Sequence, residues 1–150
     1  MNPKVVRLPP SEIKKKYNKQ GDKRGYSHYP EDLILRGFVD KEEGIIYLEE
    51  GADKVRELHE VWHFQHPHEE DLKPVALVDN ELRAELYALK KARKSPNSSV
   101  GIPAMASLLA DYSEGYTPGS ASKLVVQRLR KLGVNAPPEW AGWLSRRFGG

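Results

Sequence analysis

Cysteine is absent from the 150-residue chain, which excludes a disulfide framework and any metal site ligated by cysteine. Long apolar runs are also missing, and no segment approaches the roughly 18 apolar residues that a membrane span requires. The first residues, MNPKVVRLPPSEIKKKY, lack the apolar region of a secretory signal. We therefore expect a cytoplasmic protein that has no membrane partner.

The net charge of +3 conceals three segments of different sign. Residues 1–28 hold eight basic and two acidic residues, residues 40–85 hold five and fourteen, and residues 86–150 hold ten and three. The basic flanks fit three interpretations: solvated surface, docking of a flank on the acidic centre, or contact with nucleic-acid phosphates.

Two apolar segments in the first third of the chain favour β-strands. They are Leu33–Val39 and Ile45–Leu48, and the charged residues 40–44 between them, which end in glycine, predict a hairpin turn. Before these strands, the sequence predicts only a short helix around Ser11–Tyr17.

Helices are predicted for most of the remaining chain. Asp53 is a good N-cap for a helix over residues 53–65. Asp79 or Asn80 would cap a second helix that runs to about Lys94. After a break at residues 95–99, shorter helices are expected near residues 103–112, 120–132 and 138–148.

Residues 59–63, His-Glu-Val-Trp-His, have the pattern HExxH. Histidines four residues apart lie one turn apart on the same helix face, so both imidazoles can reach one ion. The glutamate beside the first histidine can polarise a water on that ion. We expect the histidines to border a cleft, while an apolar arc packs inward: Val55, Leu58, Val61 and Trp62.

A catalytic zinc ion needs a third protein ligand if its fourth position is to hold water. Glu81 and Glu85 lie one turn apart on the inward side of the next predicted helix, and Glu81 is the preferred ligand. His66 shares the face of the first two histidines, but about 10 Å of helix axis separates residues 59 and 66. The alternatives for the third ligand lie in the following loop: His68, Glu69, Glu70 and Asp71.

This arrangement resembles the gluzincin branch of the zincin metallopeptidases, where HExxH is followed by a separate helix carrying Glu-xxx-Asp or a relative. Here that segment is residues 81–85, Glu-Leu-Arg-Ala-Glu. The resemblance covers roughly residues 33–94 and extends to minigluzincins and to small soluble peptidases that cleave phage repressors.

The resemblance implies an α+β, zincin-like fold. A small antiparallel sheet or hairpin would pack on the HExxH helix and the glutamate helix, with extra C-terminal helices. The expected organisation is a basic N-terminal segment over 1–28, a metallopeptidase core over 29–94, and a helical extension over 95–150 packed on that core.

The resemblance also implies a zinc-dependent endopeptidase. Zn²⁺ would be bound by His59, His63 and Glu81, with Glu60 as the general base acting on the metal-bound water. Glu85 would hold a ligand histidine in its ligating tautomer.

Two further parts of such a site have candidates in the sequence. A peptide substrate would lie antiparallel along an edge strand made of Ile45, Ile46, Tyr47 and Leu48. The donor that stabilises the oxyanion has six candidates: His66, His68, Arg83, Tyr87, Tyr112 and Tyr116.

Two other functions fit the sequence. The basic flanks suit a nucleic-acid-associated binding protein whose metal site is structural or vestigial. Alternatively, the basic and aromatic C-terminal tail covers the acidic cleft, which would make the chain a latent peptidase.

Overall fold

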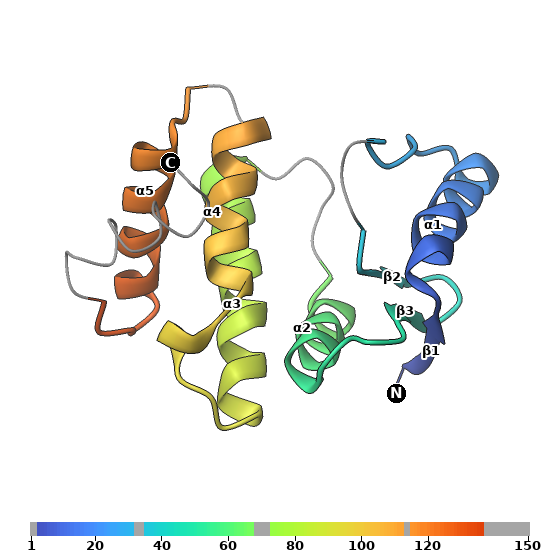
Figure 1. Cartoon of the computed structure of the whole chain (residues 1–150), viewed down its shortest axis with the longest axis horizontal. Coiled ribbons are helices and arrows are strands. Elements are labelled where there is room, and N and C mark those ends of the chain that lie inside the picture. The colour runs from blue at the N-terminus through green and yellow to red at the C-terminus, as the bar shows by residue number, and fades with distance from the viewer. Residues whose placement is uncertain (1–2, 32–34, 68–72, 113–114, 137–150) are drawn as a thin grey trace. The chain divides into compact units, whose positions relative to one another are not determined.

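The computed structural model describes residues 3–31, 35–67, 73–112 and 115–136. These residues form five α-helices, a short 3-10 helix and a three-stranded sheet (Figure 1), so the α+β class is confirmed. The chain divides into two compact units, Met1–Pro67 and His68–Gly150. That boundary falls inside the expected core of residues 29–94, whose extent as a peptidase stays a prediction.

The first unit is built on a mixed sheet with the strand order β1-β3-β2. β3 (Ile45–Glu49) pairs in parallel with β1 (Lys4–Leu8), and on its other side it pairs antiparallel with β2 (Gly37–Asp40). Since β1 was not expected, the sheet is larger than the predicted hairpin and only partly antiparallel.

β3 is therefore the central strand of the sheet. The prediction of a strand at Ile45, Ile46, Tyr47 and Leu48 is confirmed, but the prediction that it is an edge strand is wrong. Each of these residues has a partner on both sides; Tyr47, for example, lies opposite Val6 and Phe38. A strand paired on both sides has no free row of backbone N–H and C=O groups for a peptide.

The hairpin turn between β2 and β3 is confirmed. Gly44 has φ 69°, which glycine adopts without strain, and the Asp40 carboxylate accepts a hydrogen bond from Glu43 N at 3.1 Å. The same buried carboxylate accepts one from Gln20 Nε2 at 3.0 Å and lies 2.5 Å from Arg24 Nη1. The hydrogen bond with Asp40 raises the pKa of Arg24. These contacts join the turn to the end of α1.

α1 (Pro10–Arg24) is longer than the short helix predicted around Ser11–Tyr17. Proline suits its first turn, and the helix ends at Gly25, which has φ 85°. Its buried residues are Ile13, Gln20 and Gly21, which make too weak an apolar stripe to predict the second half of the helix.

The faces of the sheet pack against different helices. Tyr47 packs with Ile13 of α1, whereas the next side chain, Leu48, points to the opposite face and is fully buried. From that opposite face Arg7 Nη2 reaches Glu57 Oε1 of α2 (Lys54–Gln65) at 3.3 Å. The sheet thus lies between α1 and α2 (Figure 1).

The second unit is helical in its described part. It contains α3, η1, α4 and α5, which span Pro74–Lys91, Pro96–Ser98, Gly101–Tyr112 and Pro118–Lys131. α4 and α5 are close to their predicted ranges, and the helix predicted at 138–148 lies outside the described residues. The three α-helices share a core of fully or nearly fully buried side chains: Leu82, Leu89, Ile102, Val125 and Leu129.

The predicted start of α3 is wrong. The helix begins at Pro74, five residues before Asp79, and its N-cap residue Lys73 makes no side-chain capping bond. Asp79 instead accepts two hydrogen bonds from Arg128 of α5, from Nε at 2.7 Å and from Nη2 at 2.5 Å. Across the described residues, no helix is both long and apolar enough to cross a membrane.

Candidate metal centre

α2 carries the HExxH residues, and a local signal sets where it begins. The Asp53 carboxylate accepts a hydrogen bond from Arg56 N at 2.9 Å, which confirms the predicted N-cap. The helix ends at Gln65, directly before His66 and Pro67. The pattern therefore lies wholly within one regular helix.

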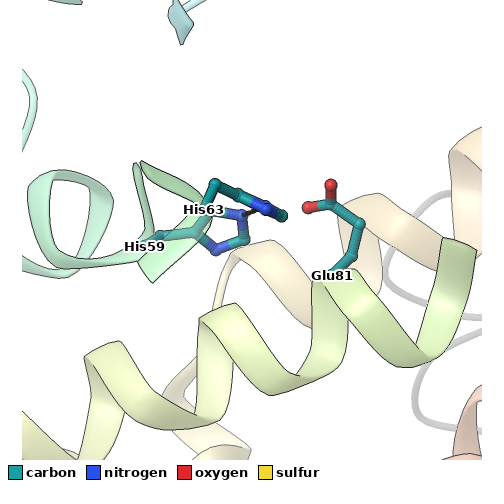
Figure 2. Close-up of side chains that lie close together, drawn as sticks. All are labelled: His59, His63 and Glu81. Carbon is teal, nitrogen blue, oxygen red and sulfur yellow. Dashed lines mark hydrogen bonds between the residues drawn. The ribbon is translucent and has the colours of Figure 1, made fainter. Parts of the chain in front are cut away.

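The two histidines of the pattern direct the same ring atom toward one point. His59 Nε2 and His63 Nε2 lie 3.1 Å apart, and their ring centroids are 4.8 Å apart (Figure 2). Two nitrogens that each lie about 2.0–2.1 Å from one zinc ion at a tetrahedral angle would be about 3.3 Å apart. The separation within α2 therefore suits two ligands of one ion.

The buried side of α2 differs from the predicted one. His59 and Glu60 are its buried residues, 7 % and 9 % exposed, whereas the apolar arc is only half-buried: Val55, Leu58, Val61 and Trp62. The expected inward packing of this arc is therefore seen only in part, and the cleft beside the histidines stays a prediction. The Trp62 ring stacks instead on His66, with centroids 4.2 Å apart, and meets His63 edge-on. A helical wheel shows which residues share a face, but not what covers that face.

Three donor residues form a group that could hold a metal ion: His59, His63 and Glu81. One ligand atom from each of His59, His63 and Glu81 lies within 4.8 Å of the other two (Figure 2). No other group of this kind occurs in the part of the chain that the structure describes. The histidines belong to the first unit and Glu81 to the second, so Glu81 as third ligand stays a prediction.

Glu85 is buried in the second unit, with 4 % of its surface exposed. Its Oε2 atom accepts a hydrogen bond from Ser99 Oγ at 3.2 Å. Ser99 Oγ in turn accepts one from Ile102 N, at 3.1 Å, in the first turn of α4. Sequence reasoning missed Ser99, although a serine just before a helix is a common capping signal.

Among the competing ligands that the structure describes, His66 does not belong to the group of three donors. His66 is exposed, and its Nδ1 atom lies 2.9 Å from the carbonyl oxygen of Trp62. The other loop candidates lie outside the described residues: His68, Glu69, Glu70 and Asp71.

The candidates for the oxyanion donor are not narrowed by the structure. Arg83 is exposed, and the ring of Tyr87 lies beneath Lys91 Nζ, 5.9 Å from its centroid. Tyr116 is half-buried, and the side chain of Tyr112 is not described. No contact of these residues indicates which of them would face a substrate.

Many cations of the basic flanks are engaged within the protein. Lys14 Nζ donates to the carbonyl oxygen of Glu31 at 2.9 Å, and Lys16 Nζ lies over the Tyr47 ring, 5.5 Å from its centroid. Arg130 Nε donates to the carbonyl oxygen of Ala136 at 2.6 Å. These contacts give the cations structural roles and do not by themselves favour nucleic-acid binding.

A scan against protein-family models, a search of curated proteins and a search of solved structures each give no match to this chain.

Proposed function

We propose that this protein is a zinc-dependent metallopeptidase that cleaves internal peptide bonds. The observation that carries the proposal is the 3.1 Å separation of the His59 and His63 Nε2 atoms on one helix. Two neutral imidazoles at this spacing suit zinc, which prefers nitrogen and oxygen donors in four-coordinate sites when no thiolate is present.

Glu60 is the proposed general base. It follows His59 directly, so its side chain leaves α2 about 100° around the axis from that ligand. It is buried, which suits a carboxylate that must receive a proton away from bulk water. Bound zinc would supply the Lewis acidity that makes water a nucleophile near neutral pH. Glu60 would take the proton from that water and pass it to the leaving amine.

Glu81 is the proposed third ligand, and Glu85 the residue that holds a ligand histidine in place. Support for Glu81 comes from the group of three donors described above. Support for Glu85 is its burial one turn from Glu81, because a buried carboxylate requires partners of opposite charge or hydrogen-bond donors. Three protein ligands would leave the fourth position open, as catalytic zinc sites do.

The first experiment measures zinc and proteolysis on the same full-length preparation. Zinc-loaded protein should contain about one equivalent of metal and should cleave denatured casein, and a chelator should abolish that cleavage. Glu60→Gln should keep the metal and lose at least about a hundredfold in rate, the lower range of general-base contributions. Zinc below half an equivalent after loading would refute the metal site; full zinc without cleavage would refute the peptidase.

A second experiment tests the third ligand. Glu81→Ala should lower zinc affinity by more than about tenfold, whereas Glu50→Ala should not, because the Glu50 side chain is exposed. Unchanged affinity in Glu81→Ala would remove this residue from the site while leaving the histidine pair intact.

A further inference from the structure

The connection between α3 and α4 fixes the carboxylate of Glu85 through Ser99. The Ser99 hydroxyl has one proton and accepts with its lone pairs. Ile102 N donates to that oxygen at 3.1 Å, and the hydroxyl proton is then directed at Glu85 Oε2, 3.2 Å away. Ser99 is 2 % exposed, so water does not compete for this chain of hydrogen bonds.

The Glu85 carboxylate also packs closely against Gly101. A Cβ atom built on Gly101 would overlap Glu85 Oε2 and would lie 2.7 Å from Glu85 Cδ. The carboxylate therefore packs directly on the backbone of the first residue of α4. A negative charge at this end of a helix is favoured by the unpaired N–H groups and by the helix dipole.

We infer that Ser99 and Gly101 are positioning residues for the proposed zinc site, because they hold the Glu85 carboxylate in one place. This inference rests on the proposed function, in which Glu85 orients a ligand histidine. A residue that orients a metal ligand changes metal affinity about 10–100-fold when it is replaced. A residue that anchors the orienting group should have a smaller effect of the same sign.

Two substitutions disturb Glu85 by different routes. Ser99→Ala removes the hydroxyl, and Gly101→Ala keeps the hydroxyl but places a methyl group where the carboxylate lies. Each should weaken zinc binding about three- to tenfold in a chelator-competition assay, while Ser99→Thr should restore affinity. In a Glu85→Ala background neither substitution should weaken zinc binding further, because the group they position is gone.

Ser122→Ala is the matched control. Ser122 is also fully buried in the second unit, and its hydroxyl donates to Pro118 O at 2.8 Å. Its replacement should lower the free energy of unfolding as Ser99→Ala does, but leave zinc affinity unchanged. If zinc-loaded wild-type protein binds metal and Ser99→Ala and Gly101→Ala bind it equally well, the inference is overturned. Absence of zinc binding by the wild type would instead refute the proposed function.

Discussion

The Nε2 atoms of His59 and His63 lie 3.1 Å apart and are directed at one point beside α2. If this pair binds the metal, His59→Ala or His63→Ala should lower zinc affinity by more than a hundredfold, since even residues that only orient ligands are worth about 10–100-fold. His66→Ala provides the matched control, because His66 is exposed and bonds to its own helix. Equal affinity in all three variants, measured by chelator competition, would place the metal elsewhere.

The N-cap of α2 should contribute measurably to stability. Asp53→Ala removes the acceptor for Arg56 N and should lower the free energy of unfolding by about 1 kcal/mol. Asp53→Ser keeps a capping oxygen and should recover most of that loss. Urea denaturation followed by circular dichroism gives the free energy of unfolding of both variants. If Asp53→Ala is as stable as wild type, Asp53 does not stabilise α2 as its N-cap.

Glu57 should make stability depend on pH below neutrality. The hydrogen bond from Lys54 is the main cause that lowers the pKa of Glu57 below its ordinary 4.5, and the charge of Arg7 adds to it. A lowered pKa in the folded state means that the stabilisation is complete above pH 4.5 and is lost as pH falls through the folded value.

The test of this dependence compares Glu57→Gln with wild type across pH. The variant should be less stable by about 0.2–1 kcal/mol at pH 7, the usual range for an exposed ion pair. The difference should shrink toward zero as pH falls through the lowered pKa of Glu57, because the wild-type carboxylate then also becomes neutral. A difference that stays constant with pH would show that lost packing, not charge, causes it.

The ion pair between Asp79 and Arg128 should stabilise the contact of α3 with α5 through its two hydrogen bonds as well as through its charges. Both oxygens of Asp79 accept from the guanidinium, at 2.7 and 2.5 Å. Lysine cannot form this paired arrangement, so Arg128→Lys should lower the free energy of unfolding nearly as much as Arg128→Ala does. In a double-mutant cycle with Asp79→Asn, the effects should be non-additive; full additivity would mean that the pair contributes nothing.

The elements that could be predicted carry their signals locally. Asp53 caps its own helix, Gly44 closes its own turn, and the histidine spacing depends only on the regularity of α2. These features follow from residues within one or two turns of each other. The closeness of His59 and His63 could therefore be predicted from the sequence, because both residues lie on one helix.

The elements that were missed depend on distant partners. β1 is a strand because it pairs with residues 45–49, far along the chain. The burial of His59 and Glu60 depends on residues outside α2, which a helical wheel does not include. The role of Ser99 required Glu85 to be seen beside it, because nothing in residues 95–99 points to α3.

The mixed sheet has a consequence for how the first unit folds. The β2–β3 hairpin closes over a turn of a few residues, whereas β1 must bring residue 6 to residue 47 and so forms against a larger loop-closure entropy. We therefore expect β1 to join last and detach first. Whenever it is detached, one edge of β3 is open along an apolar segment, which is a template for edge-to-edge aggregation. By pairing with β3, β1 would thus protect that edge of the central strand from pairing with another chain.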